Sequence, residues 1–190
     1  QLMWFKYVVK NIARKHGISR EAQDRFALRS QRLARQAIET GRFLQEITPV
    51  PVPRKQETVP FDRDEHPRFD ATLENLGRLR PAFEEGGTVT AGNASGMNDA
   101  ASALILAGEE IVRKRGLRPL AELAACAQVG NDPVWMGLAP VQAVVRLLDQ
   151  AGLDLGRIDL IELNEAFAAQ VLRVIAELGE HYGEAGERIL

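Results

Sequence analysis

The sequence predicts an α/β protein whose first part is helical and rich in proline. After residue 87, short runs of β-branched and apolar residues alternate with segments of helical periodicity. Six of the nine prolines lie between residues 47 and 85, where extended, irregular or edge-strand backbone is therefore expected. The 190 residues are 45% hydrophobic and 26% charged, a composition typical of a globular chain long enough to bury a core.

Two helices are expected before the proline-rich segment. Residues 11–18 form the end of a helix that Gly17 closes, and Ser19 is an N-cap for a second helix. The apolar positions of the second helix recur at helical spacing up to Gly41: Ala22, Phe26, Leu33 and Ala37. The other face of this helix is basic: Arg20, Arg25, Arg29, Arg32 and Arg35. Solvation explains such a face, and contact with a phosphorylated ligand is the alternative.

The later part of the chain is expected to alternate strands and helices. Strands are predicted at 87–90, 120–129 and 158–163, whereas 100–107 fits either a buried strand or a buried helix. Helices are predicted at 109–115, 141–151 and 166–178, the first two ending at Gly116 and Gly152. This order indicates a parallel sheet with right-handed crossovers.

The segment Gly87–Asp99, GTVTAGNASGMND, is the first candidate for function. A short strand leads into a turn of small residues. Because these residues have no large side chains, the main chain of the turn can closely approach a neighbouring element or a ligand. A tight turn between buried elements is one interpretation. The other is a ligand-facing loop, in which Ser95 and the backbone at Gly96 meet a substrate.

A second candidate is the Asn164-Glu165 pair, which follows the strand predicted at 158–163. Functional sites gather at the carboxyl ends of parallel strands. Alternatively, Asn164 caps the following helix and Glu165 meets its dipole.

Both strings resemble motifs of the thiolase family. Segment 87–99 is similar to the family signature, and 164–170, NEAFAAQ, is similar to its NEAF motif, about 70 residues later. The similarity covers about residues 11–178. It implies part of a layered α/β/α/β/α fold, in which 1–86 is a loop region covering the active site. Residues 87–117 would end the N-terminal half, and 118–190 would be part of the C-terminal half.

The resemblance also implies roles for individual residues. Asn164 orients a water in an oxyanion hole, and Ala166 and Phe167 line the pocket. Coenzyme A is contacted by the following residues: Arg68 and Asn75 near the nucleotide, Phe83 against adenine or pantetheine, and Ser95 on the pantetheine arm beside Gly96. The family often has Ser at the position of Asn75, so this contact departs from its pattern.

Other departures concern the chemistry. In thiolases a reactive Cys takes the acyl group while a Cys and a His move protons. The nucleophile belongs upstream of this sequence, and the histidine and second Cys belong downstream. Cys126, the only cysteine, is expected to be a buried, inert residue of strand 120–129. The tail 179–190 is faintly similar to the histidine-containing segment, with His181 one place out of step. Trp4-Phe5-Lys6 stands where many members have His-Met-Gly.

The expected function is therefore that of a thiolase fragment: an acyltransferase of fatty acid metabolism that interconverts acetyl-CoA plus acyl-CoA with 3-ketoacyl-CoA plus CoA. The fragment alone is expected to be inactive, because its nucleophile is absent. A non-catalytic CoA-binding module and an inert piece are the alternatives. No metal or redox cofactor is expected, and the intact protein is expected to be a dimer or tetramer.

Composition and targeting signals limit which binding partners and which cellular locations are expected. A net charge of −2 without a dense Lys/Arg stripe argues against a nucleic-acid surface. No run reaches the roughly 18 apolar residues of a membrane span, and no signal peptide is expected. The expected location is the cytoplasm, with mitochondria and peroxisomes as alternatives. Because a fragment would contain only some strands of the family's sheet, that sheet is expected to expose apolar edges.

Overall fold

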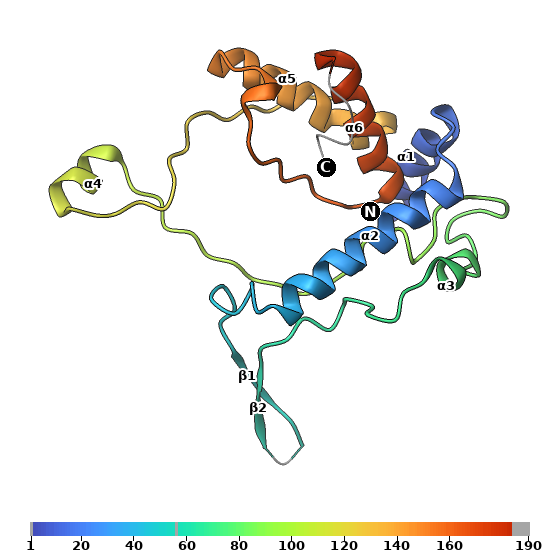
Figure 1. Cartoon of the computed structure of the whole chain (residues 1–190), viewed down its shortest axis with the longest axis horizontal. Coiled ribbons are helices and arrows are strands. Elements are labelled where there is room, and N and C mark those ends of the chain that lie inside the picture. The colour runs from blue at the N-terminus through green and yellow to red at the C-terminus, as the bar shows by residue number, and fades with distance from the viewer. Residues whose placement is uncertain (1, 56, 184–190) are drawn as a thin grey trace. The chain divides into compact units, whose positions relative to one another are not determined.

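A computed structural model describes residues 2–55 and 57–183, with side chains described from residue 8 onward (Figure 1). The chain divides into two compact units. The first unit comprises Gln1–Gly96 and Leu163–Arg173, and the second comprises Met97–Glu162 and Val174–Leu190.

The first unit contains the helices predicted near the N-terminus. Its elements are α1 (Leu2–Lys15), α2 (Arg20–Glu39), β1 (Val50–Pro53), β2 (Thr58–Phe61), α3 (Leu73–Gly77) and the start of α6 (Ala168–Tyr182). The predicted cap of α2 is confirmed, because the Ser19 hydroxyl accepts a hydrogen bond from the Ala22 N–H at 3.1 Å. An Asx, Ser or Thr cap of this kind satisfies one of the free N–H groups of the first turn.

The apolar core of the first unit joins three segments that are distant in sequence. Buried residues of α1, of the segment before the small-residue turn and of α6 pack together: Val9, Ala13, Val89 and Ala169. Phe83 and Phe167 pack against this cluster from outside. The signature segment and the start of α6 are therefore held on the same core.

The second unit is built from helices and long irregular segments. Its elements are α4 (Glu109–Arg115), η1 (Pro133–Leu138), α5 (Ala139–Ala151), η2 (Leu155–Arg157) and the rest of α6. The predicted ends of α4 and α5 are confirmed, since Gly116 and Gly152 adopt left-handed φ values of 59° and 63°. Glycine adopts this conformation at little cost in free energy, and it allows backbone N–H groups to hydrogen-bond the last carbonyls of the helix. In the part of the chain that is described, no helix is both long and apolar enough to cross a membrane.

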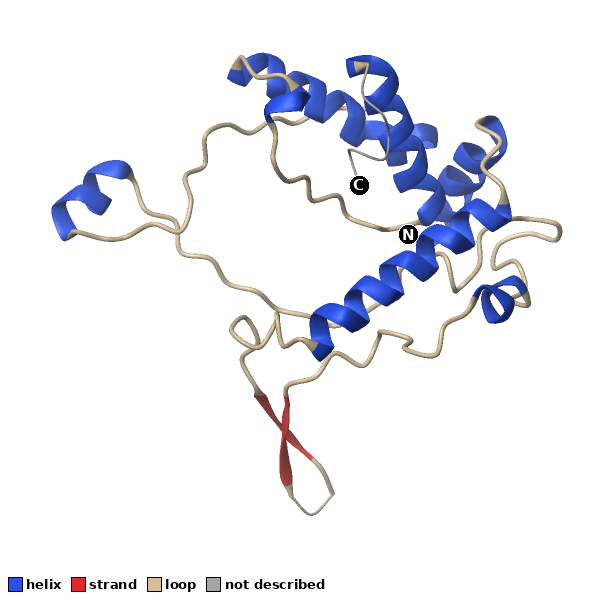
Figure 2. Cartoon of the chain, in the orientation of Figure 1, coloured by secondary structure: helices blue, strands red, loops and turns tan. Residues whose placement is uncertain are grey.

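The predicted strands are not formed. Residues 87–90, 100–107, 120–129 and 158–163 are irregular, and the strands within 2–55 and 57–183 are the antiparallel pair β1 and β2 (Figure 2). This hairpin pairs Val50 with Phe61 inside the proline-rich segment, where short edge strands were one expectation. The helix alternative for 100–107 is also wrong.

Solvent exposure gives the physical reason for the missing strands. Leu104, Ile105 and Leu106 are 90%, 97% and 83% exposed, so no other segment within residues 2–55 and 57–183 covers them. A strand is stabilised by a ladder partner and by burial of one face, and an apolar run without either has no reason to order. For the same reason the prediction that Cys126 is buried is wrong, because its thiol is exposed.

Candidate functional site

The two motif strings lie side by side in the first unit. The Ser95 N–H donates to the Ala166 carbonyl at 2.9 Å, and the Ala168 N–H donates to the Asn93 carbonyl at 3.0 Å. Between these bonds, Ala94 and Phe167 form an isolated antiparallel bridge. Two segments about 70 residues apart in the sequence therefore share one backbone pairing.

Ser95 lines a hollow of about 250 Å³ beside this pairing. Polar residues of α2, of the segment before α3 and of both motifs contribute to its wall, among them Ser30, Gln31, His66, Asn93 and Glu165. The Ser30 hydroxyl donates to Glu165 Oε2 at 2.6 Å. Within residues 2–55 and 57–183 the exposed Ser95 hydroxyl has no hydrogen-bond partner, so a ligand can take it.

Asn164 precedes Glu165 and is exposed. Its side-chain amide makes no hydrogen bond within the described residues. Because α6 begins at Ala168, the prediction that Asn164 caps this helix is wrong. Its neighbour Glu165 bonds Ser30 rather than the first turn of α6. Asn164 is thus free for a water or a ligand, next to a residue of the Ser95 hollow.

Gly96 lies against the imidazole of His66. A Cβ placed at Gly96 would lie 2.4 Å from His66 Cε1 and 2.8 Å from its Nδ1, far inside van der Waals contact. The imidazole therefore occupies the space of a Cβ at position 96, and a side chain there would displace the half-buried ring. His66 is a site residue that the sequence did not reveal, since its partner is 30 positions away.

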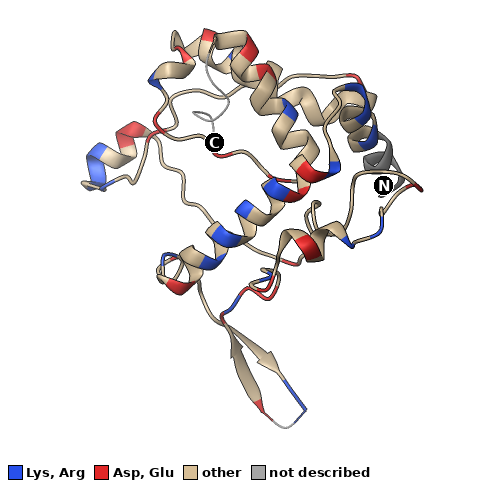
Figure 3. Ribbon diagram, turned by 45° about the vertical axis from the view of Figure 1, so that its right-hand side comes forward, with Lys and Arg blue, Asp and Glu red and all other residues tan. Residues whose placement is uncertain are grey.

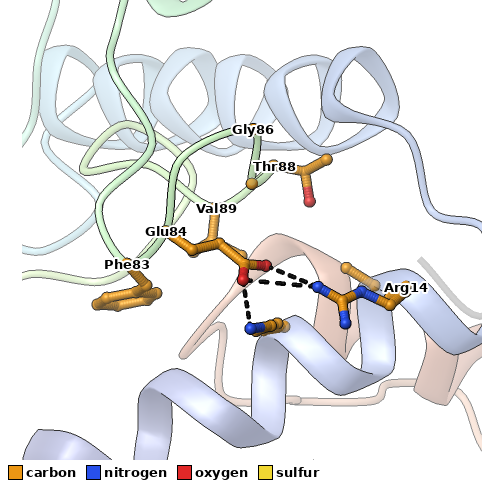
Figure 4. A pocket seen from close by; sticks show the side chains of 9 residues that line it. Arg14, Phe83, Glu84, Gly86, Thr88 and Val89 are labelled. Carbon is orange, nitrogen blue, oxygen red and sulfur yellow. Dashed lines mark hydrogen bonds and ion pairs between the residues drawn. The ribbon is translucent and has the colours of Figure 1, made fainter.

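Phe83 lines a different hollow, of about 180 Å³ (Figure 4). Its ring meets Phe167 edge-on, with centroids 6.4 Å apart. Glu84, in the same wall, accepts a hydrogen bond from Arg14 at 3.2 Å and pairs with Lys10. The hydrogen bond from Lys10 is the main cause that lowers the pKa of Glu84. The structure thus assigns Phe83 and Ser95 to separate hollows.

Arg68 and Asn75 are both exposed. The Arg68 N–H donates to Gln31 Oε1 at 2.7 Å, and Gln31 lines the Ser95 hollow. Within the described ranges the Arg68 guanidinium has no partner, so it is available to a phosphate. The Asn75 N–H is taken by the Thr72 hydroxyl, which caps α3.

His181 lies near the end of α6, in the second unit, and its ring meets that of Tyr182 with centroids 4.6 Å apart. Ser95 and Asn164 belong to the first unit, so a catalytic role for His181 stays a prediction. The faint similarity of the tail continues into 184–190, outside the described residues. The side chains of Trp4, Phe5 and Lys6 are also outside them.

Figure 3 shows basic residues along α2. Most arginines of this face are exposed, as the solvation interpretation predicted: Arg25, Arg29, Arg32 and Arg35. Arg25 and Arg35 form ion pairs with acidic residues one turn away on the same helix. Arg20 differs, because it pairs with buried Asp24 and donates to the Leu76 carbonyl at 2.5 Å. It therefore ties α2 to α3.

Comparisons with known proteins place nearly the whole chain in one family. The family model of the thiolase N-terminal domain matches residues 7–110, and that of the C-terminal domain matches 117–185. Acetyl-CoA acetyltransferases of Escherichia coli and Pseudomonas aeruginosa are 52% and 53% identical over 90% of this chain. These alignments cover 43% and 44% of the two relatives, so the chain spans less than half of their length.

Solved structures give the same result. The acetyl-CoA acetyltransferase of Bacillus anthracis superimposes with a TM-score of 0.90 at 41% identity, over 97% of this chain and 46% of the other. Human mitochondrial 3-ketoacyl-CoA thiolase in complex with CoA gives a TM-score of 0.84 at 46% identity, over 90% and 42%. The fold class is thus the thiolase-like α/β class, and within residues 2–55 and 57–183 its regular elements are helices and the β1–β2 hairpin. The chain belongs to the thiolase family.

Proposed function

We propose that this chain provides the acyl-CoA-binding and oxyanion-stabilising part of a thiolase-type acyltransferase. The intact enzyme would interconvert acetyl-CoA plus acyl-CoA with 3-ketoacyl-CoA plus CoA. The observation that carries the proposal is the backbone pairing of Ser95 with Ala166, which joins the two motif strings at one hollow. Relatives named acetyl-CoA acetyltransferase support the substrate class.

The polar side chains at this place suit a thioester. The Ser95 hydroxyl would hydrogen-bond the pantetheine arm, and the Arg68 guanidinium would bind a phosphate of the nucleotide. When a nucleophile attacks the thioester carbon, negative charge develops on the carbonyl oxygen. A water held by the Asn164 amide would donate to this oxygen, and such preorganised donors typically contribute most in a site that excludes bulk water.

The nucleophile is proposed to lie outside this chain. Cys126 is exposed on an irregular segment of the second unit, whereas a reactive thiol needs a neighbour that stabilises the thiolate. We therefore expect binding without turnover. The proposed chemistry consists of acyl and proton transfers, so we propose no redox or metal cofactor. A cytoplasmic location and a dimeric or tetrameric intact protein are further parts of the proposal.

A non-catalytic CoA-binding module is the second candidate. It is favoured because the side chains that line the Ser95 hollow all belong to the first unit, and Cys126, the single cysteine, is not among them. Acyl transfer by the chain alone would count against this candidate and against the inactive fragment. If Cys126→Ser left such turnover unchanged, a missing thiol would not be essential.

The proposal is tested by isothermal titration calorimetry of CoA into the full chain. We expect saturable binding that Ser95→Ala weakens about fivefold, the usual value of one hydrogen bond. Ser102→Ala is the matched control, since this serine is exposed and irregular. Absence of binding in the unsubstituted chain, or equal affinity after Ser95→Ala, would contradict the proposal.

A further inference from the structure

We infer that Asp24 and Asn93 form a buried positioning pair, which holds the Ser95 segment against residues 166–168 for ligand binding. The inference rests on the proposed function, because it assigns to this pair the geometry of the proposed thioester site. Neither residue is expected to touch the ligand's reacting atoms.

The Asn93 side chain makes three hydrogen bonds across the signature turn, out of the four that an amide can make. Its Nδ2 donates to Asp24 Oδ1 at 2.9 Å and to the Thr88 carbonyl at 3.1 Å. Its Oδ1 accepts from the Thr90 N–H at 2.9 Å. The residue is 3% exposed. Its main-chain carbonyl accepts from Ala168, so one residue joins the turn, α2 and the start of α6.

Asp24 is also 3% exposed and carries its charge into this buried place. Its Oδ2 accepts from Arg20 Nε at 2.7 Å, while its Oδ1 is the acceptor for Asn93. Both carboxylate oxygens are therefore satisfied. Removing either partner leaves the other buried and incompletely bonded, which costs more than the bond itself.

A second link runs parallel to the first. Gln23, on the same turn of α2, donates from Nε2 to the Thr88 hydroxyl at 3.0 Å. The turn is thus attached to α2 at two neighbouring residues. Because Ser95 follows Asn93 by two residues, a displaced Asn93 would move the Ser95 hydroxyl away from its hollow.

Exchanging the two side chains tests the pair. Asn93→Asp places a carboxylate oxygen where Nδ2 faced Asp24 and the Thr88 carbonyl, so like charges and acceptors meet. In the double variant Asp24→Asn with Asn93→Asp, the new amide at 24 can donate to 93 and accept from Arg20. Glu21→Gln is the matched control, since Glu21 lies on the same helix in an exposed Arg ion pair.

Two readouts separate positioning from folding. Hydrogen exchange of the Ser95 and Ala168 amides reports the motif pairing, and the Kd for CoA reports the site. We expect Asn93→Asp to accelerate both amides and to weaken CoA binding, each about tenfold. The double variant should recover part of both losses, because its carboxylate at 93 still faces the Thr88 carbonyl, and Glu21→Gln should change neither.

Each outcome decides the inference. Unchanged amide exchange in Asn93→Asp, or a double variant no better than Asn93→Asp, would overturn it. Accelerated exchange with an unchanged Kd would reduce the pair to a structural role and also overturn it. If the unsubstituted chain bound no CoA, the proposed function would fail, and the exchange data alone would then decide whether the pair holds the two segments together.

Discussion

The first unit and residues 97–162 of the second both contain apolar residues, but many of these are buried in the first unit and many are exposed in 97–162. Ile12 is completely buried in α1, whereas Ile105 is 97% exposed on an irregular segment. The first unit has three distant segments around one core and a polar network that crosses it. The comparison shows that apolar content orders a segment only where a partner covers it.

The two regions also differ in how their polar groups are hydrogen-bonded. In the signature turn of the first unit, the N–H of Thr90 and the side chain of Asn93 satisfy each other away from solvent. In 98–107 the backbone groups face water, and no gain from burial offsets the entropy of ordering them. The difference can be tested by substitutions that destabilise the first unit and by measurements of order in residues 98–107.

The largest expected contrast is in backbone protection. Amides of Thr90, Ser95 and Ala168 are hydrogen-bonded in the first unit, and they should exchange roughly a thousandfold more slowly than those of residues 98–107. Hydrogen exchange followed by mass spectrometry or NMR measures both sets in one sample. Equal protection would mean that 98–107 has a ladder partner after all.

The next contrast is between matched isoleucines. Ile12→Ala removes a fully buried side chain and should lower the free energy of unfolding by about 2–5 kcal/mol. Ile105→Ala, at the exposed site, should change it by less than about 0.5 kcal/mol. Urea denaturation compares the two variants. A similar cost at both positions would show that 105 is buried in solution.

A smaller effect is expected at Gly96. Gly96→Ala places a Cβ against the His66 imidazole, and because this half-buried ring can rotate away, the substitution should destabilise the first unit by about 0.5–1 kcal/mol. Gly108→Ala is the control, because a Cβ there meets nothing within 4 Å. Combining Gly96→Ala with His66→Ala should restore most of the loss, as judged by thermal unfolding. Failure of this rescue would remove the steric explanation.

The smallest effect is the pH dependence of Glu84. Lys10 lowers the pKa of Glu84 in the folded chain, so the unfolded chain binds the proton more readily. Its contribution to stability is therefore present above the unfolded pKa and is lost as the pH falls through the folded value. Unfolding measured between pH 3 and 7 should lose part of its acid dependence in Glu84→Gln. An identical acid dependence would exclude this ion pair as a contributor.

The longer helices could be predicted because their signals are local, whereas α3 (Leu73–Gly77) formed within the proline-rich segment where irregular backbone was expected. Ser19 caps α2, and Gly116 and Gly152 end α4 and α5 as expected. The strands could not, because a strand depends on a neighbour that an apolar run such as 100–107 does not specify. The sequence pattern identified these runs as apolar, but it did not identify the neighbouring strand with which each would have to pair.

The site divides in the same way. The two motif strings were predicted to form one site on the strength of a resemblance, and the roles of Asn164, Ser95 and the other named residues stay predictions. The contacts of Asp24 with Asn93 and of His66 with Gly96 could not be inferred, since they join positions 69 and 30 residues apart. An asparagine within a turn of small residues was the signal that the sequence offered.

The central claim is that the two motif strings pair directly, and one NMR measurement tests it without any substitution. Ala94 and Phe167 face each other between two hydrogen bonds, and in such an antiparallel pair the Cα atoms lie about 4.5 Å apart. A strong NOE between the Hα protons of Ala94 and Phe167 is the predicted result. Its absence from a spectrum that shows the sequential helical NOEs of α2 would contradict the account.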